Sequence, residues 1–410
     1  MPTWITSFDE SRPLMNRLAR EIIRRLREVL GATAAPVPLH EPLFAGKEEV
    51  YVRECITTGW VSSVGAFVDR FEEELARFTG ARRAVALVNG TCALQLALRL
   101  AGVRADDEVL VPALSFVATA NAVAHLGAVP HFVDIEPATL GLDPDKLKEH
   151  LAAVVEMRAA GPFNRHTGRR LAAIVPMHAF GHPVRLPELL EVAAAYGLPV
   201  VEDAAESLGS TREGRHTGLW GQSGILSFNG NKVITTGGGG ALLCQDETLA
   251  RRAKHLSTTA KTPHPWRLAH DEAAYNFRMP NLNAALGCAQ LEQLPGFLRR
   301  KRALAEAYQE AFADMEELRF VREPAGARSN YWLCVLALNP AAATSLEAIL
   351  RAARADGLML RPAWELLSTL PMYAGCPRAD LGAAEEWQPR LCCLPGGPAL
   401  QPPPNIPNAL

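Results

Sequence analysis

The sequence predicts an α/β protein: a mostly parallel sheet sandwiched by helices, with a smaller α/β domain at the C-terminal end. Two observations support this prediction. Six short apolar runs, at residues 84–88, 108–111, 172–175, 199–201, 224–228 and 240–244, show little alternation between polar and apolar positions. Helical stretches such as 92–101 and 186–196 separate these runs. Continuous apolar strands that alternate with helices are typical of parallel sheets covered on both faces.

The first 38 residues are expected to form an amphipathic helix and a linker. Between residues 14 and 30, Leu, Ile and Val recur mostly at three- and four-residue steps, arginines occupy the other face, and Gly31 ends the pattern. Residues 32–38, rich in Ala and Pro, form the expected linker. A basic amphipathic helix can bind a membrane surface. Docking on the chain's own body or on a second subunit is the favoured interpretation.

The rest of the chain is expected to divide into a large domain at residues 39–290 and a small C-terminal domain at 291–410. A length of 410 residues exceeds what one compact domain usually needs. Residues 291–308 predict a helix that leaves the large domain, with a kink at Pro295 and Gly296. A strand at 330–338 and a helix at 345–356 are expected after it.

Composition and charge exclude several classes of protein. The 42 basic and 44 acidic residues give a net charge of −2, so nothing indicates a nucleic-acid partner. Residues 109–133 carry no charged side chain, yet Pro112 and Gly127 divide them into strand, helix and strand rather than a membrane span. The first ten residues lack the apolar core of a signal peptide. Eight cysteines form no Cys-x-x-Cys pair, which favours free thiols in a cytoplasmic protein.

Candidate site residues follow the predicted strands, because ligands of such sheets bind at the carboxyl ends of the strands. Gly90 and Thr91 open the helix after the first strand, where backbone N–H groups can bind a phosphate; a capped helix without ligand is the alternative. Asp203 follows the strand at 199–201 and could cap a helix, bind a metal or pair with a protonated ring nitrogen.

His178 and His182 have the i,i+4 spacing of a helical metal site. Gly181 and Pro183 break any helix there, so no metal site is expected.

Lys232 gives the strongest chemical signal. It lies between an apolar run and a Thr-Thr turn followed by four glycines, and it is the only charged residue between 221 and 245. A lysine in such surroundings can lose its proton and form a Schiff base, and the glycines permit tight turns. An aldehyde for Lys232, a ring nitrogen for Asp203 and a phosphate for Gly90 and Thr91 together predict pyridoxal 5′-phosphate as cofactor.

Seven motifs, in order between residues 39 and 302, resemble the DegT family of sugar-nucleotide aminotransferases. They are Leu-His-Glu-Pro at 39–42, Gly-Trp-Val-Ser-Ser-Val-Gly at 59–65, Val-Asn-Gly-Thr at 88–91, Ser-Phe-Val-Ala-Thr-Ala-Asn at 115–121, Glu-Asp-Ala-Ala-Glu-Ser at 202–207, the Lys232 stretch and Tyr-Asn-Phe-Arg-Met-Pro-Asn at 275–281. Within that family the sequence is most similar to the LegC group of the bacillosamine and legionaminic acid pathways. The resemblance implies the fold of the fold-type-I pyridoxal phosphate-dependent transferases.

The resemblance also implies a role for each candidate residue. Lys232 would form the Schiff base and move a proton between cofactor and substrate, and Asp203 would pair with the pyridine nitrogen. Phe116 would stack on the ring, and Glu206 would lie near the phenolic oxygen, where the family often has Gln or His. The phosphate would be held by Gly90, Thr91, Cys92 and Ser227. Asn276 would complete the phosphate site of the neighbouring subunit, which implies a homodimer.

The implied reaction is transamination of a nucleotide-linked 4-keto-6-deoxy sugar with L-glutamate as amino donor. The favoured substrate is UDP-2-acetamido-2,6-dideoxy-4-hexulose, which would become UDP-4-amino-4,6-dideoxy-N-acetyl-hexosamine. Two alternatives remain: an aminotransferase for a GDP-linked 4-keto sugar, similar to perosamine synthases, and a pyridoxal phosphate-binding regulator without turnover. The candidates for substrate contacts are Trp60, Ser62, Arg278, Tyr331 and Arg361.

Overall fold

The computed structural model describes residues 17–31 and 36–400. The expected start of the N-terminal helix before Arg17 and most of the expected linker lie outside the described residues. Among the helices that are described, none is both long and apolar enough to cross a membrane.

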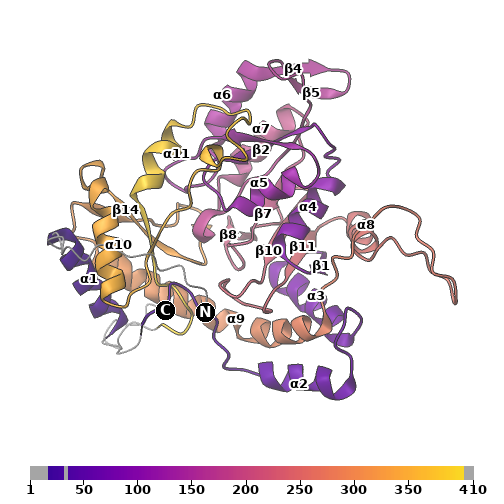
Figure 1. Cartoon of the computed structure of the whole chain (residues 1–410), viewed down its shortest axis with the longest axis horizontal. Helices are drawn as coiled ribbons and strands as arrows, with labels where there is room; N and C mark the ends of the chain where they lie inside the picture. The colour runs from indigo at the N-terminus through magenta and orange to yellow at the C-terminus, as the bar shows by residue number, and fades with distance from the viewer. Residues whose placement is uncertain (1–16, 32–35, 401–410) are drawn as a thin grey trace.

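One large sheet occupies the centre of the molecule (Figure 1). Its strand order is β1 (Arg83–Leu87), β11 (Gly240–Cys244), β10 (Ser223–Ser227), β7 (Val201–Asp203), β6 (Leu171–Ile174), β2 (Glu108–Pro112) and β3 (Val129–Val133). Parallel bridges at Ile174–Val200 and Met177–Asp203 join β6 to β7. Neighbouring strands are parallel except at β11, which runs antiparallel to both β1 and β10. The mostly parallel sheet predicted from the sequence is confirmed.

Helices cover both faces of this sheet, which explains why its strands are apolar throughout. Along β2, Val109 and Val111 pack into one core cluster, whereas Leu110 between them packs into another. The first cluster contains residues of α3 (Ala66–Thr79), α4 (Gly90–Leu100), α5 (Val117–Ala124) and α8 (Glu247–Ser257). The second contains residues of α6 (Pro144–Val154) and α7 (Leu186–Ala195). The uncharged stretch 109–133 thus forms β2, α5 and β3, as predicted.

A long helix, α9 (Asn281–Ala311), connects the large sheet to the C-terminal part of the chain. It starts before the expected domain boundary at residue 290 and continues through Pro295. Ala284 and Leu294 pack in the core of the large sheet, and Leu304 and Tyr308 pack in the C-terminal core. One helix therefore belongs to both cores.

The C-terminal part contains an antiparallel sheet in the order β12 (Leu318–Phe320), β14 (Cys334–Leu338), β16 (Leu391–Leu394) and β15 (Arg361–Pro362). Helix α10 (Leu346–Ala355) packs on this core, and so does α1 (Arg17–Leu30) through Ile22 and Leu26. The arginine face of α1 also contacts the chain, because Arg25 forms an ion pair with Asp314. The described part of the N-terminal segment thus docks on the chain's own body.

The remaining elements lie outside these two sheets. They are α2 (Glu48–Thr58), β4 (Val155–Arg158), β5 (Gly161–Asn164), β8 (Thr211–Arg212), β9 (Arg215–His216), β13 (Ala327–Arg328) and α11 (Gly382–Trp387). The segment that follows α8 projects from the body of the molecule (Figure 1), and its Trp266 is 82% exposed.

Candidate active site

A cavity of about 190 Å³ lies beyond the carboxyl ends of β7 and β10, at the N-terminus of α4. The C-terminal part of the chain closes its other side. Eight of the residues predicted from the sequence line it: Gly90, Thr91, Phe116, Asp203, Glu206, Ser227, Lys232 and Arg361. Residues far apart in the sequence are therefore brought together as the strand-end argument predicted.

The N-terminus of α4 forms one end of the cavity. The first N–H groups of a helix have no acceptor within the helix. The Oδ1 atom of Asn89 accepts a hydrogen bond from the N–H of Cys92 at 2.8 Å, and Gly90 and Thr91 line the cavity. A Cβ atom on Gly90 would lie 3.0 Å from Cβ of Ser227. Glycine therefore lets the hydroxyl-bearing end of β10 approach the helix, which leaves a suitable place for a phosphate. Cys92 itself does not line the cavity.

Asp203 supplies a buried carboxylate at the end of β7. Its Oδ2 atom accepts a hydrogen bond from the Thr119 hydroxyl at 2.8 Å, and its Oδ1 atom accepts one from the N–H of Ala205 at 3.2 Å. Burial raises the pKa of Asp203, and these hydrogen bonds oppose the rise. A protonated ring nitrogen would favour the ionised form of this carboxylate.

Lys232 and Glu206 face each other across the cavity wall. The Nζ atom of Lys232 lies 3.3 Å from Oε1 of Glu206 and 4.1 Å from the ring centre of Trp332. The other carboxylate oxygen of Glu206 accepts a hydrogen bond from the N–H of Phe180 at 3.0 Å. Burial raises the pKa of Glu206 to about 7, although the charge of Lys232 opposes this. Near neutral pH, Glu206 can therefore gain or lose a proton beside the amine of Lys232.

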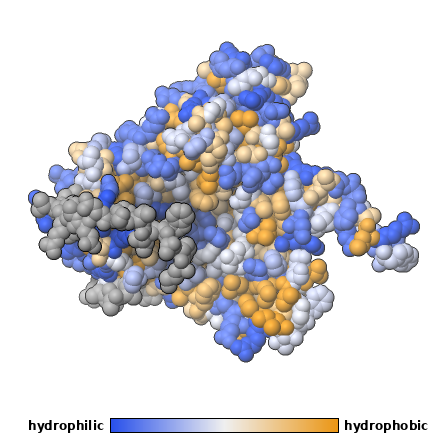
Figure 2. All heavy atoms as spheres, in the orientation of Figure 1, coloured by the Kyte–Doolittle hydropathy of each residue, from blue (hydrophilic) through white to orange (hydrophobic). Residues whose placement is uncertain are grey.

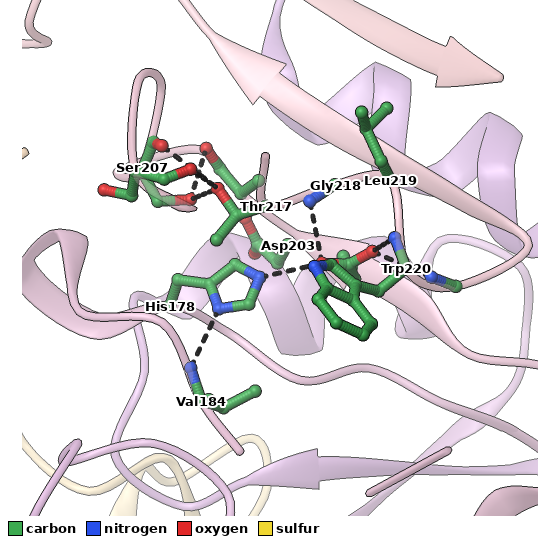
Figure 3. A network of polar contacts seen from close by, with 12 residues as sticks. His178, Val184, Asp203, Ser207, Thr217, Gly218, Leu219 and Trp220 are labelled. Carbon is green, nitrogen blue, oxygen red and sulfur yellow. Dashed lines mark hydrogen bonds and ion pairs between the residues drawn. The ribbon is translucent and has the colours of Figure 1, made fainter. Parts of the chain in front are cut away.

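Glu202, next to Asp203, does not line the cavity, because it belongs to a separate buried network. Its carboxylate accepts hydrogen bonds from the N–H groups of Gly218, Trp220 and Gly221 at 2.6–2.8 Å. His178 Nε2 lies 3.1 Å from it, and the N–H of Val184 donates to His178 Nδ1 (Figure 3). Burial opposes ionisation of Glu202, but His178 and the N–H groups together lower its pKa.

Two tryptophans from the C-terminal part complete the wall, and sequence reasoning missed both. Trp332 donates from Nε1 to the carbonyl of Asn231 at 2.7 Å. Trp364 stacks on Phe180 with ring centres 4.8 Å apart and ring planes 1° apart. Phe116 also lines the cavity and is 48% exposed, so part of its ring is available to a ligand.

The side chain of Tyr331, chosen from the sequence as a substrate contact, lies outside this wall. It is only 5% exposed and its ring packs against those of His182 and Phe320. The neighbouring Trp332 lines the cavity instead, because Asn330 Oδ1 accepts a hydrogen bond from its N–H while Asn330 Nδ2 donates to the carbonyl of Glu206. An asparagine directly before a Tyr-Trp pair was the signal available in the sequence.

Four further candidates lie outside the cavity lining. Trp60 and Ser62 occupy the exposed turn between α2 and α3, and Asn281 holds both of their carbonyls through its backbone N–H and side chain. Asn276 and Arg278 lie beyond α8, where Arg278 Nε donates to Asn276 Oδ1 at 2.8 Å. Within one chain, the structure does not bring these four residues to Lys232.

The residues of the cavity fit pyridoxal phosphate. Lys232 offers an amine for its aldehyde, Asp203 a buried carboxylate for its ring nitrogen, and Phe116 an exposed ring for its face. The N-terminus of α4 offers N–H groups and hydroxyls for its phosphate. No metal is needed to satisfy this donor set.

Comparison with known proteins identifies the family. The sequence profile of the DegT/DnrJ/EryC1/StrS aminotransferase family matches residues 44–404. EpsN of Bacillus subtilis (strain 168), named as a pyridoxal phosphate-dependent aminotransferase, is 35% identical over 363 residues, which cover 88% of this chain and 90% of EpsN. A GDP-perosamine synthase of Escherichia coli O157:H7 is 34% identical, with 82% of this chain and 87% of the relative covered.

A solved structure agrees with this assignment. The aminotransferase TlmJ from Streptoalloteichus hindustanus superposes with a TM-score of 0.79 at 30% identity, over 88% of this chain and 93% of TlmJ. The fold is that of the fold-type-I aminotransferases. The closeness to the LegC group expected from the motifs is not among these findings. The chain belongs to the DegT/DnrJ/EryC1/StrS aminotransferase family.

Proposed function

We propose that this chain is a pyridoxal phosphate-dependent aminotransferase that transfers the amino group of L-glutamate to C4 of a nucleotide-linked 4-keto-6-deoxy sugar. A single observation carries the proposal: Lys232, Asp203 and the N-terminus of α4 line one small cavity. An aldehyde-reactive amine, a ring-nitrogen partner and a phosphate anchor are the three groups that this cofactor needs. A regulator without turnover would not require Lys232 to lie beside a second proton-holding group.

Each residue of the cavity has a separable task. When bound, pyridoxal phosphate supplies an electrophilic carbon and an electron-withdrawing ring. Lys232 would offer Nζ to the aldehyde carbon of the bound cofactor and would carry a proton during the exchange of the amine. Glu206 takes or returns a proton at Nζ, since the two groups lie 3.3 Å apart and its pKa is near neutrality. Asp203 would hold the ring nitrogen in its protonated form, and the two tryptophans would exclude water.

The nucleotide of the sugar is proposed to be GDP. The relative from Escherichia coli O157:H7, named GDP-perosamine synthase, is 34% identical over most of both chains. This similarity favours a GDP-linked sugar over the UDP-linked substrate that the motifs favoured. The UDP sugar remains the second candidate because the seven motifs as a set resemble the LegC group.

A homodimer is proposed as the active unit. Asn276 does not line the cavity of its own chain, and its backbone pairs with Thr258 at the base of the segment that projects from the body after α8. Exposed apolar side chains gather on α2 and the turn after it, at the lower edge of the molecule in Figure 2; they are Val50, Ile56, Trp60, Val61 and Val64. A second copy would cover this surface. Mixing K232A with N276A subunits tests the shared site: mixed dimers should regain activity that neither variant has alone.

Absorbance during sequential additions tests the reaction itself. L-glutamate should convert the cofactor from its aldehyde to its amine form. A GDP-linked 4-keto-6-deoxy sugar should then restore the aldehyde spectrum, and a UDP-linked 4-keto-6-deoxy-N-acetylglucosamine should do so more slowly. Restoration by the UDP sugar alone would reverse the choice of nucleotide. No response to glutamate or to either sugar would contradict the proposed function.

A further inference from the structure

Lys301 is a buried cation of α9 whose partners in the described part of the chain include no carboxylate. It is only 2% exposed. Its Nζ atom lies 3.1 Å from His40 Nε2, and it donates to the carbonyl of Trp332 at 3.2 Å and to the carbonyl of Gly396. An ammonium group has three N–H donors, so it can serve all three acceptors, whereas a neutral amine can serve only two. Burial lowers the pKa of Lys301 to about 7, and these acceptors favour its charged form.

His40 provides one of the three acceptors of this ammonium group. It belongs to the Leu-His-Glu-Pro motif at 39–42, none of whose residues lines the cavity. Burial and the charges of Lys301 and Lys232 lower the pKa of His40 well below its usual range, so its ring is neutral near pH 7. Its Nε2 atom can then accept from Lys301 while the proton lies on Nδ1. Nδ1 is buried and has no hydrogen-bond partner among the residues that the structure describes, so the contact with Lys301 is the polar contact that orients the ring.

Trp332 is held at both ends by this arrangement. Lys301 donates to its carbonyl, and the carbonyl of Asn231 accepts a hydrogen bond from its indole Nε1 at 2.7 Å. The centre of the indole ring lies 4.1 Å from Nζ of Lys232. A ring in this position attracts the charged form of an amine. The place of the ring therefore influences both the proton and the orientation of the Lys232 side chain.

Burying a cation at this place costs more free energy than burying an apolar side chain of similar size, so a role beyond packing is expected of Lys301. We propose that Lys301 and His40 are positioning residues for amine transfer: His40 orients the ammonium group, which holds Trp332 so that its indole stays against the amine of Lys232. The proposal rests on the proposed function and gives a task to the motif at 39–42. Neither residue lines the cavity, so both act through Trp332. Because Lys232 serves both half-reactions, both should depend on the pair, while substrate affinity should not.

Substitutions of His40 test the proposal on the cofactor-loaded protein without changing its charge. H40L removes an acceptor of Lys301, and H40Q offers an amide oxygen in its place. K301M removes the donor, and R300M, at an exposed neighbour on α9, is the matched control. The absorbance of the bound cofactor, followed against pH without substrate, reports the proton at Nζ of Lys232. Stopped-flow absorbance gives the rate of each half-reaction and the Kd of glutamate and of the sugar. H40L combined with W332F completes a double-mutant cycle.

We expect H40L to slow both half-reactions by about 10-fold, the effect of losing one hydrogen bond to a charged group, while both Kd values change less than about 2-fold. The pH midpoint of the absorbance should fall by about one unit, because an indole ring displaced from Nζ no longer favours the charged amine. H40Q should recover most of the rate, K301M should be slowed at least as much as H40L, and R300M should match the wild type. Added to W332F, H40L should slow the reaction by less than about 3-fold more.

Unchanged rates and an unchanged midpoint in H40L would overturn the proposal even if the free energy of unfolding fell, because the pair would then be structural only. A loss confined to Kd would also overturn it, and so would losses of H40L and W332F that multiply, since the two residues would then act independently. If K301M fails to fold, H40L and H40Q decide. The midpoint needs no substrate: a shifted midpoint in H40L, together with a wild type that transfers no amine to either sugar, would overturn the proposed substrate and leave the positioning role intact.

Discussion

Glu202 and Glu206 are two buried carboxylates on either side of the same strand end, and the protein treats them in opposite ways. Glu202 receives three backbone N–H groups and faces His178, so its pKa is lowered even though burial opposes this. Glu206 receives one backbone N–H group and faces Lys232, and burial raises its pKa to about 7. Both side chains are at least 98% buried.

The difference shows that burial alone does not define a reactive carboxylate. What separates the two is the number of donors that the backbone commits to each. The network of Glu202 satisfies its charge permanently and fixes the loop at 218–221 behind β7. Glu206 accepts only one backbone hydrogen bond and lies beside the amine of Lys232, so its carboxylate can lose and regain a proton. The first region is built for stability and the second for proton transfer.

The substitution K232A tests most strongly whether the Glu206–Lys232 pair serves the chemistry rather than stability. It should reduce amine transfer by at least about 10⁴-fold, because it removes both the nucleophile and the proton carrier. The free energy of unfolding of the cofactor-free protein should change little. Steady-state rates and urea unfolding measure the two effects, with K148A on the exposed face of α6 as control. Retained transfer in K232A would remove Lys232 from the chemistry.

The stability side of the comparison is tested by E202A against E206A. Removing Glu202 leaves three N–H groups and His178 without their acceptor, which should lower the free energy of unfolding by about 4 kcal/mol. Removing Glu206 at pH 7.5 leaves one N–H group unpaired and should cost about 1 kcal/mol or less. Urea unfolding of the cofactor-free proteins gives both values. Equal losses would mean that the two carboxylates are structurally equivalent.

Titration sharpens the comparison. The pKa of Glu206 rises from its usual 4.5 to about 7 on folding, so the folded state binds its proton more tightly than the unfolded state. This contribution to stability is fully present below pH 4.5 and is lost as pH rises through 7. Relative to E206Q, the wild type should lose roughly 3 kcal/mol of unfolding free energy across that window. A flat difference between the two proteins from pH 4.5 to 8 would contradict a raised pKa.

The smallest effect is expected at the aromatic wall. W332F keeps a ring near Lys232 but removes the hydrogen bond from Nε1 to Asn231. The loss of about 1 kcal/mol corresponds to a roughly 5-fold slower glutamate half-reaction. W364F, which preserves stacking on Phe180, is the matched control and should be closer to the wild type. If W364F is slowed more than W332F, the stacking of Trp364 on Phe180 contributes more to the position of the cavity wall than the hydrogen bond of Trp332 does.

The half of the cavity built on the large sheet could be predicted from the sequence, and the other half only in part. Gly90, Asp203 and Lys232 each follow an apolar run, so local pattern places them at one sheet edge. Trp332 and Trp364 reach the same place because Asn330 bridges to the loop after β7 and Phe180 stacks across. Contacts between residues so far apart in the sequence produce no periodic pattern of residue types in it. The boundary expected at residue 290 lies within α9, and nothing in an apolar helix pattern shows that this helix packs in two cores.

Helix α9 has a consequence for how the molecule comes apart. It has 31 residues and is about 46 Å long. Its N-terminal half packs in the core of the large sheet and its C-terminal end in the C-terminal core. In its C-terminal half, Lys301 donates a hydrogen bond to the carbonyl of Trp332, so α9 also positions a residue that lines the cavity. If either core unfolds, α9 loses the packing contacts that it makes with that core, and this also destabilises the other core. The two parts should therefore unfold as one cooperative unit, and the cavity between them should persist until both are lost.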